Sequence, residues 1–586
     1  MSDDAFQRLN PAIQYHVVNS LGWKTLRPAQ LAAIDPILSG KSCLVLAPTA
    51  GGKTEAAIIP VLSRMLTEDW RGLTVLYICP IKALLNNLEE RLSRYAALVG
   101  RRVQVWHGDV SQSAKGRALR DAPDILLTTP ESLEGMLISL RVDRQSWFGA
   151  LRVAIVDELH AFAGDDRGWH VRAVLGRLQE FTSAPIQRIG LSATLGNPRE
   201  LLRWFTGGHG GVVVGESAPS ADADVTIDYV GTLANAATVV SRLHRGAKRL
   251  VFCDSRARVE ELAANLRELG TRTFVSHSSL SVSERRQAEQ AFAEDRDCVI
   301  VATSTLELGI DVGDLDFVIQ IDAPTTVSSF LQRMGRTGRR SGSRRNCLFL
   351  TTSDEALLIV GGIARLWKEG FVEDIVPPPE PWHLAAQQAM ALVLQSNGIG
   401  LSECERKVAA LFPELPASGV REIHEHMCAT DNLTQQDGLL SFGLRGERLY
   451  GRQNFLELLS SFASPLQFLV RYGSNELGYV DPVCLQGEGD GAPVLLLGGR
   501  SWHVASVDWP RRTVWVEPAR EQGKARWFGS SRSLGFELCQ AVRRVLCDGL
   551  PGVTLSKRAG AQLQAVCEGL PSFGLDSLVF EHTGDG

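Results

Sequence analysis

The sequence predicts an α/β protein: two tandem doubly wound domains, then a winged-helix module and a small β-barrel with terminal helices. From about residue 30 to 215, short apolar runs that end in polar residues alternate with amphipathic helical segments. Such continuous apolar runs are typical of buried parallel strands, which carry function at their carboxyl ends. The alternation recurs after residue 215 and indicates a second domain of similar size. The runs of the first domain are 42–48, 73–80, 124–130, 152–158 and 188–194.

The composition favours a soluble, cytoplasmic, globular protein. Of 586 residues, 44% are hydrophobic and 22% charged, and no apolar run approaches the roughly 20 residues of a membrane span. The acidic start is not a secretory signal, and the eleven cysteines form no CxxC pair, so we expect reduced thiols and no zinc site. A net charge of −5 does not exclude nucleic acid, which needs only local positive charge. The expected domain boundaries are 1–215, 216–375, 376–455, 456–530 and 531–586.

The segment LAPTAGGKTEAA (46–57) predicts a nucleotide site, because it follows a strand and precedes a helix as a phosphate-binding loop does. Gly51 and Gly52 let backbone N–H groups face a phosphate without a Cβ in the way. Lys53 would reach the β- and γ-phosphates, and Thr54 would ligate Mg²⁺. A glycine-rich turn without a ligand is the alternative, and the positive end of the following helix favours the nucleotide.

A pair of carboxylates ends the run VAIVDELH, where Asp157 and Glu158 follow four apolar residues. Asp157 can hold Mg²⁺ through water, and Glu158 can orient or deprotonate the attacking water. The alternative is a solvated acidic loop, which is disfavoured directly after a buried strand in a chain with a phosphate loop. ATP and Mg²⁺ are therefore the expected cofactors.

The order APTAGGKT, DELH (157–160) and SAT (192–194) resembles the superfamily 2 DExH-box helicases of DNA and RNA. In that family an alanine, here Ala47, is normal at the first loop position. The resemblance implies two RecA-like P-loop motor domains and makes LRPAQ the adenine-reading Q motif, with Trp23 or Phe6 stacking on the base. The ATP-binding residues that we expect are Arg27, Gln30, Thr49, Gly51, Gly52, Lys53, Thr54, Gly309, Asp311 and Gln332.

The resemblance also implies a surface that binds a nucleic-acid strand. CPIKALLNN (79–87), TTPESL (128–133), SHSS (276–279) and ATSTLELGID (302–311) match its strand-contacting and ribose-side motifs, and SAT is the motif that couples hydrolysis to motion. Expected strand contacts are Pro80, Lys82, Thr129, Pro130, Arg256, Ser276 and Thr303, and expected coupling residues are His160, Ser192 and Thr194.

The second domain has no phosphate loop, but FLQRMGRTGRR provides arginines spaced to reach a transferring phosphoryl group. The resemblance assigns the run as motif VI and makes Arg336 and Arg339 the finger candidates. With Lys53, Asp157 and Glu158 they complete the expected catalytic set. A solvated, flexible loop is the alternative. The nucleotide would lie in a cleft between the two domains. Closing and opening of that cleft would shift one domain relative to the other along a bound strand.

Two accessory regions follow. VPPPEPW (376–382) predicts a boundary, and helices near 382–396, 401–411 and 417–429 with a hairpin predict a winged helix; a small helical packing domain is the alternative. Short strands after residue 464 predict a small β-barrel, and helices near 533–547 and 555–569 close the chain. Trp502 is the aromatic residue that we expect to stack on a base, with burial in the barrel core as the alternative.

This layout, together with DDRGWHVRAVLGRL (165–178), is similar to the Lhr (large helicase-related) branch, which has a comparable RG-x-H-x6-RL run. The resemblance implies 3′-to-5′ tracking on single-stranded DNA, with DNA or RNA as the displaced strand, in DNA repair or in phage defence. No membrane partner is expected. Two rivals remain: a duplex translocase that never separates strands, and a nucleic-acid clamp with an inactive ATPase.

Overall fold

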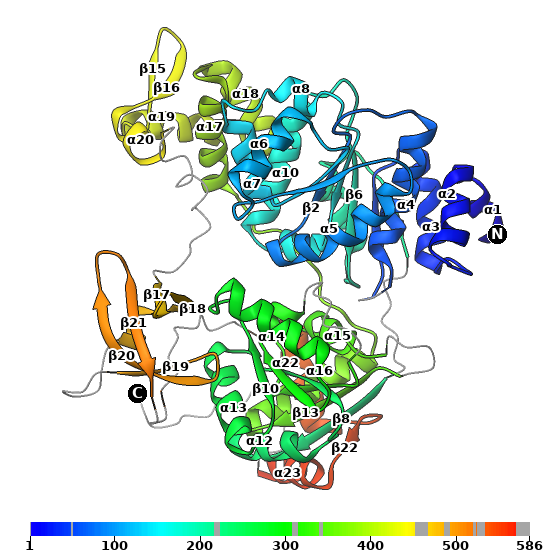
Figure 1. Cartoon of the computed structure of the whole chain (residues 1–586), viewed down its shortest axis with the longest axis vertical. Helices are drawn as coiled ribbons and strands as arrows, with labels where there is room; N and C mark the ends of the chain where they lie inside the picture. The colour runs from blue at the N-terminus through cyan, green and yellow to red at the C-terminus, as the bar shows by residue number, and fades with distance from the viewer. Residues whose placement is uncertain are drawn as a thin grey trace. The chain divides into compact units, whose positions relative to one another are not determined.

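The computed structural model describes residues 2–48, 51–215, 223–307, 315–338, 344–451, 467–485, 493–519, 523 and 534–569. These residues divide into two compact units (Figure 1). The first lies within Met1–Ala47, Gly51–Ser217 and Asp374–Ser464, and the second within Pro48–Ala50, Ala218–Glu373 and Pro465–Gly586. Each unit thus contains one motor sheet and one accessory module. Within the described residues, no helix combines the length and apolar character that crossing a membrane takes.

The first unit is built on a parallel seven-stranded sheet of order β3-β4-β2-β5-β6-β1-β7. Its strands are β1 (Cys43–Leu46), β2 (Val75–Ile78), β3 (Val103–Trp106), β4 (Ile125–Thr128), β5 (Val153–Val156), β6 (Gln187–Ser192) and β7 (Val212–Val214). Alternate strand residues face opposite sides, so Val45 and Tyr77 belong to one apolar cluster and Leu44 and Leu76 to another. Helices cover both faces, which is why the central strands are apolar throughout.

The helices of this domain begin with the N-terminal α1 (Ser2–Gln7), α2 (Pro11–Tyr15) and a π-helical turn at His16–Ser20. Those that follow are α3 (Pro28–Leu38), α4 (Lys53–Thr67), α5 (Lys82–Ala97), α6 (Gln112–Arg120), α7 (Pro130–Ile138), α8 (Arg144–Phe148), α9 (Leu159–Ala163), α10 (Asp166–Gln179) and α11 (Pro198–Phe205).

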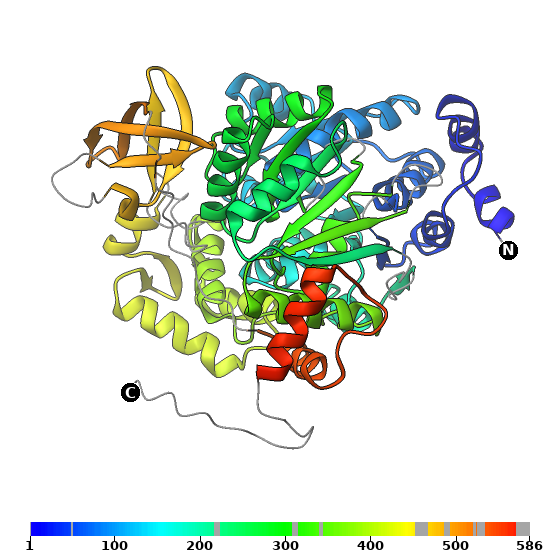
Figure 2. The same ribbon diagram turned by 90° about the horizontal axis from the view of Figure 1, so that it is seen from below.

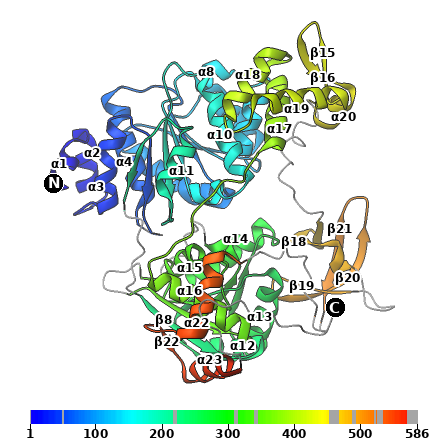
Figure 3. The same ribbon diagram turned by 180° about the vertical axis from the view of Figure 1, so that it is seen from behind.

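The winged-helix module packs on the first motor domain through α10 (Figure 3). It consists of α17 (Trp382–Ser396), α18 (Leu401–Leu411), α19 (Ala417–Ala429) and a sheet of order β14-β16-β15, followed by α20 (Leu444–Tyr450). The strands are β14 (Ile399–Gly400), β15 (Leu433–Gln436) and β16 (Leu439–Phe442). Trp169 and Ala173 of α10 lie in the apolar core of the module, and the Trp169 indole donates to the Pro378 carbonyl at 2.8 Å.

A buried polar network fixes the same junction. Glu134 of α7 lies 3.0 Å from His170 Nε2 and is also ion-paired with Arg177, both residues of α10. The Gln388 side chain of α17 donates to Glu134 at 2.7 Å, and Arg177 donates to Gln395 at 2.6 Å. The RG-x-H-x6-RL run therefore supplies the histidine and the arginine that tie the winged helix to the motor domain.

The second unit has a parallel sheet of order β10-β11-β9-β12-β13-β8-β22. Its strands are β8 (Asp224–Tyr229), β9 (Lys248–Phe252), β10 (Thr273–Ser276), β11 (Cys298–Ala302), β12 (Phe317–Ile321), β13 (Asn346–Thr351) and β22 (Thr554–Leu555). The helices around it are α12 (Leu233–Arg242), α13 (Arg256–Glu268), α14 (Val282–Glu294), α15 (Val327–Met334) and α16 (Asp354–Lys368), with a 3₁₀ turn at Ser304–Leu306.

A curled, half-barrel sheet of order β18-β17-β21-β20-β19 packs against this domain. Its strands are β17 (Phe468–Tyr472), β18 (Asn475–Val480), β19 (Val494–Leu497), β20 (Arg500–Asp508) and β21 (Thr513–Pro518), with a 3₁₀ turn at Pro482–Leu485. Phe468, Val470 and Val514 share one apolar cluster with Val275 and Leu280 of the motor domain. The two parallel sheets and the curled sheet confirm the predicted fold class.

The C-terminal helices α22 (Phe536–Asp548) and α23 (Lys557–Gly569) pack on the second motor domain instead of forming a module of their own (Figure 2). A Cβ at Gly362 of α16 would lie 2.9 Å from Val542 Cγ2, so the glycine permits the close approach of α22. Arg365 of α16 is ion-paired with Asp548 at 3.1 Å. The strand β22 extends the motor sheet beside β8.

Candidate nucleotide site and nucleic-acid surface

The phosphate loop ends where α4 begins, at Lys53. Gly52 has φ +79°, and a Cβ there would lie 2.4 Å from Gln30 Nε2, so only glycine fits. Gln30 donates to the Gly52 carbonyl at 3.3 Å and accepts from the Arg27 N–H at 2.9 Å. The segment predicted to bind adenine therefore lies directly on the loop. Thr49 lies outside the described residues.

The acidic pair lies at the carboxyl end of β5, beside the loop. Asp157 is buried and accepts hydrogen bonds from the Tyr77 hydroxyl at 2.8 Å and from the Glu158 N–H at 2.9 Å. Burial, followed by the neighbouring Glu158 charge, raises the pKa of Asp157 to about 6. Lys53 Nζ lies 3.3 Å from Glu158 Oε2, so the structure brings the predicted lysine and both carboxylates together.

These groups fit a magnesium ion. The Thr54 hydroxyl and the Asp157 carboxylate are hard oxygen ligands of the type that Mg²⁺ prefers. Asp157 and Glu158 are both buried and adjacent, and a divalent cation would relieve the negative charge gathered there. Arg91 Nη2 donates to the Thr54 hydroxyl at 2.9 Å and so occupies it in this structure.

His160 joins the acidic pair to the SAT segment. Its Nδ1 lies 3.1 Å from Ser192 Oγ and 3.6 Å from Glu158 Oε2, and the Ala193 N–H points to it at 3.4 Å. Burial lowers the pKa of His160 to about 4, so the ring is neutral at pH 7. Thr194 follows, partly exposed. Two of the three predicted coupling residues thus make one chain of contacts that reaches Glu158.

The predicted strand contacts of the first unit share one edge of its sheet. Ile78 at the end of β2 pairs with Thr128 at the end of β4, so the segments that follow emerge side by side. The list of predicted contacts there is Pro80, Lys82, Thr129 and Pro130. Pro80 and Pro130 are buried, the Thr129 hydroxyl caps α7, and the half-exposed Lys82 ammonium pairs with Asp109 at 2.8 Å.

The second unit repeats this arrangement at the carboxyl ends of β9, β10 and β11. The Thr303 N–H donates to the Ser276 carbonyl at 3.2 Å. The Arg256 guanidinium donates to the Ser279 hydroxyl at 2.6 Å. The three predicted residues therefore lie at one sheet edge, although Ser276 and Thr303 have little exposed surface.

Of the two arginine-finger candidates, Arg336 lies within the described residues and Arg339 does not. Arg336 is buried, and its guanidinium donates to the backbone carbonyl of Glu307. On the adjoining helix α15, Gln332 is also buried, and Arg333 is ion-paired with the Glu307 side chain. Gly309, Asp311 and Arg339 lie outside the described residues.

The structure does not favour base stacking on Trp502. Its side chain is only 5% exposed, lies in the shared apolar cluster and donates from Nε1 to the Leu497 carbonyl at 2.9 Å. Its ring therefore has little surface left for a base. Among the described residues of this sheet region, Trp509 has an exposed indole, at 57%.

Sequence reasoning missed three residues that shape the site region. Tyr77 stands in an uninterrupted apolar strand, where nothing marks its hydroxyl as a partner of Asp157. Arg91 lies well inside α5 and carries no motif. Glu134 is one of two glutamates in TTPESLE, and only its complete burial separates it from Glu131.

Two family models match the chain. The model described as DEAD/DEAH box helicase covers residues 27–201, and the model described as Helicase conserved C-terminal domain covers residues 232–341. These matches fall on the two motor sheets and define the class of protein: a DEAD/DEAH-box helicase of superfamily 2.

Within that class the chain belongs to the Lhr-like helicases. It is 31% identical to the Lhr helicase/probable uracil glycosylase of Mycolicibacterium smegmatis over 88% of its own length and 39% of that protein. It is 29% identical to the ATP-dependent helicase Lhr-Core of Methanocaldococcus jannaschii over 64% of its own length and 47% of that protein. The chain thus spans less than half the length of these two curated relatives.

Solved structures agree. The structure of Mycobacterium smegmatis helicase Lhr bound to ssDNA and AMP-PNP aligns with a TM-score of 0.74 and 26% identity, over 96% of this chain and 74% of that one. The DUF1998 helicase MrfA bound to DNA aligns with a TM-score of 0.70 at 22% identity, over 88% of this chain and 74% of that one, which supports the fold.

Proposed function

We propose that the chain hydrolyses ATP with Mg²⁺ to move 3′ to 5′ along single-stranded DNA, and that it unwinds DNA or RNA–DNA duplexes in DNA repair in the cytoplasm. The observation that carries the proposal is the contact of Lys53 with Glu158 beside the buried Asp157, at the end of a phosphate loop. An inactive clamp would not need this arrangement.

Each residue has a distinct role in the proposed reaction. The loop amides and Lys53 would bind the β- and γ-phosphates, and Thr54 and Asp157 would hold a magnesium ion, which would supply positive charge beside the phosphates. Glu158 orients the attacking water and accepts its proton. Arg336 and Arg339 stabilise the charge of the transferring group once they reach it. Because His160 contacts both Glu158 and Ser192, a movement of Glu158 would shift Ser192 and, with it, the strand-binding edge.

The relatives support the nature of the partner. The M. smegmatis Lhr structure contains ssDNA and a non-hydrolysable ATP analogue, and the archaeal relative is named an ATP-dependent helicase. The expected strand contacts of both units lie at the carboxyl ends of their parallel sheets, the usual place for ligands in α/β domains.

A strand-displacement assay tests the proposal. Labelled duplexes with a 3′ or a 5′ single-stranded tail are incubated with enzyme, ATP and Mg²⁺, and an RNA–DNA hybrid is included. We expect displacement from the 3′-tailed substrates only. Hydrolysis of ATP without displacement would favour the duplex translocase, and displacement from the 5′ tail alone would overturn the polarity. For the repair setting, equal survival of deletion and parent strains under DNA damage would contradict the proposal.

A further inference from the structure

One attachment of the curled sheet to the second motor domain is the short segment of residues 276–281. The Tyr479 N–H donates to the Ser279 carbonyl at 2.6 Å, and the Ser281 N–H donates to the Leu477 carbonyl at 3.0 Å. The segment therefore continues the edge of the curled sheet beside β18. Because it directly follows β10, it belongs at the same time to the motor domain.

Glu260 of α13 holds a second point of attachment, and the carboxylate is fully buried. Its Oε1 accepts from the Gly498 N–H at 2.6 Å and lies 2.7 Å from His277 Nε2, and its Oε2 accepts from the Gly499 N–H. The two glycines have φ +67° and +65° and form the tight turn between β19 and β20. One carboxylate thus contacts both the 276–281 segment and the turn of the curled sheet.

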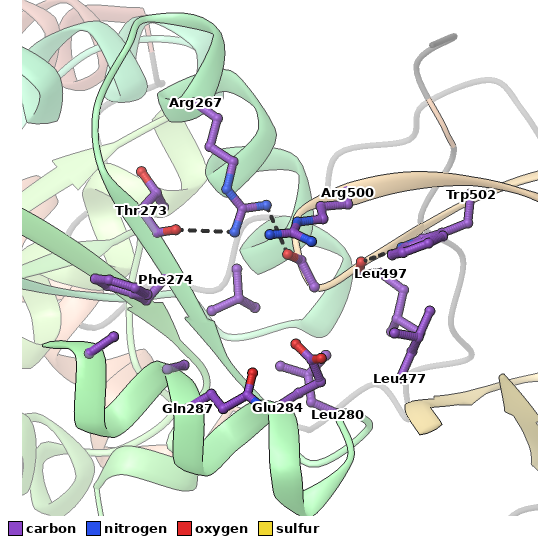
Figure 4. Close-up of a pocket in the computed structure, with 14 residues that line it drawn as sticks. Arg267, Thr273, Phe274, Leu280, Glu284, Gln287, Leu477, Leu497, Arg500 and Trp502 are labelled. Atoms are coloured by element: carbon purple, nitrogen blue, oxygen red, sulfur yellow. Dashed lines mark hydrogen bonds between the residues drawn. The ribbon is translucent and has the colours of Figure 1, made fainter. Parts of the chain in front are cut away.

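Arg267, about two helical turns further along α13, also contacts this turn (Figure 4). It donates to the Gly498 carbonyl at 2.8 Å and to the Thr273 carbonyl at 3.1 Å. A Cβ on Gly499 would lie 2.1 Å from Arg267 Nη1, so a larger residue there would push the arginine away.

Packing alone does not hold this turn. A pocket of about 310 Å³ lies beside it, between α14, β10 and the curled sheet, with Leu280, Arg500 and Trp502 in its lining (Figure 4). Because part of the seam is hollow, the polar contacts of Glu260 and Arg267 add to the apolar packing that joins the two parts. Buried hydrogen bonds to a charged group are the strong ones, which suits them to this task.

We propose that Glu260 is a positioning residue: through His277 and the Gly498–Gly499 turn it fixes the 276–281 segment against the curled sheet, so that both present one rigid surface to a nucleic-acid strand. The inference rests on the proposed function, since Ser276 is an expected strand contact. Arg256, another expected contact, donates to Ser279 within the same segment. The accessory sheet would then act on DNA binding without touching the nucleotide site.

The variant Glu260→Gln tests the proposal in the full chain. A glutamine has one acceptor oxygen, so in either orientation its NH₂ group meets a glycine N–H that the carboxylate now satisfies. We expect the ssDNA concentration for half-maximal ATPase stimulation to rise about tenfold. The kcat at saturating DNA and the KM for ATP stay unchanged. Glu261→Gln, the same change at an exposed neighbouring position on α13, is the matched control and should leave all three values unchanged.

A merely structural role gives a different result, because misfolded enzyme lowers kcat and leaves the DNA concentration for half-maximal stimulation as it was. That outcome, or unchanged values in Glu260→Gln, overturns the inference. If wild-type enzyme shows no DNA stimulation, the proposed function itself fails.

If Glu260→Gln does not fold, Gly499→Ala replaces it, with Gly473→Ala as control. Gly473 has φ +58° in the β17–β18 turn of the same sheet, but its Cβ would meet open space. We expect weaker DNA stimulation and faster amide exchange across 276–281 for Gly499→Ala alone. Equal behaviour of the two glycine variants contradicts the proposal.

Discussion

The two units attach an accessory module to a motor domain with different chemistry. Each joins an accessory module to a motor domain through a buried glutamate next to a buried histidine: Glu134 with His170 in the first, Glu260 with His277 in the second. In the first unit the guanidinium of Arg177 balances the glutamate charge. In the second, the N–H groups of a glycine turn solvate it.

The difference shows what each junction can tolerate. Loss of Glu134 leaves the buried Arg177 charge without its ion-paired carboxylate, whereas loss of Glu260 leaves two glycine N–H groups unsatisfied and weakens a longer-range attraction to Arg267, a smaller penalty. Both glutamates also lie close to an expected strand contact, because α7 begins at Pro130 and His277 follows Ser276. We therefore expect the Glu134 junction, which holds the winged helix, to be stronger than the Glu260 junction, which holds the curled sheet.

Of the variants considered, Glu134→Gln should cause the largest loss of stability. We expect a loss of about 3–5 kcal/mol in the free energy of unfolding of the first unit, because Arg177 stays buried without a counter-charge. Urea unfolding of the full chain measures the loss, and amide exchange in α7, α10 and α17 locates it. Glu131→Gln is the control: this second glutamate of α7 pairs with Arg167 of α10 but is 30% exposed, so its loss should cost under about 1 kcal/mol.

A second substitution sharpens this result. Combining Glu134→Gln with Arg177→Met removes both charges, and most of the lost stability should return. A double variant that is as unstable as the single one would show that the network acts through its hydrogen bonds and not through its charges.

The pH dependence of the first junction should be the next largest effect. Burial alone would raise the pKa of Glu134, but the Arg177 charge, with hydrogen bonds from His170 and Gln388, outweighs burial and lowers it from 4.5 to about 2. Such a shift corresponds to about 3 kcal/mol of stability. Since the folded-state pKa is the lower one, this contribution is complete above about pH 4.5 and is lost as the pH falls towards 2. The stability gap between wild type and Glu134→Gln should therefore narrow below pH 4.5 in acid titrations, and a constant gap would be contrary to this account.

Trp502→Phe should give the smallest effect, in the second unit. The variant loses the hydrogen bond to Leu497 and some packing, for about 1–2 kcal/mol of stability. Its affinity for ssDNA, measured by fluorescence anisotropy, should stay within about twofold of wild type, because a core indole stacks on no base. A fall in affinity of about tenfold or more with stability unchanged would restore Trp502 as a strand contact.

Local patterns were sufficient to predict much of this molecule. The apolar runs around Val45 and Ile155 form central strands, and the winged-helix helices begin and end at the residues that the sequence indicates. The phosphate loop and the acidic pair could be predicted because their chemistry lies within a few consecutive residues, at the ends of buried strands.

Contacts between distant segments could not be predicted in this way. Arg177 meets Gln395 from 218 residues away, and Glu260 meets Gly499 from 239 residues away. The strand β22 joins the second motor sheet only because the C-terminal helices fold back on α16 and β8. Trp502 stands in an alternating strand, where the sequence pattern suits a core face and an exposed face equally well.

The rate of ATP hydrolysis by Glu158→Gln, with and without ssDNA, tests the central claim most directly. If Glu158 accepts the proton of the attacking water, kcat should fall about 100- to 10,000-fold while binding of ATP and of ssDNA persists. Glu90→Gln, an exposed position on α5, should retain the wild-type rate. DNA-stimulated hydrolysis by Glu158→Gln at a rate close to wild type would contradict the assignment of this carboxylate and the account built on it.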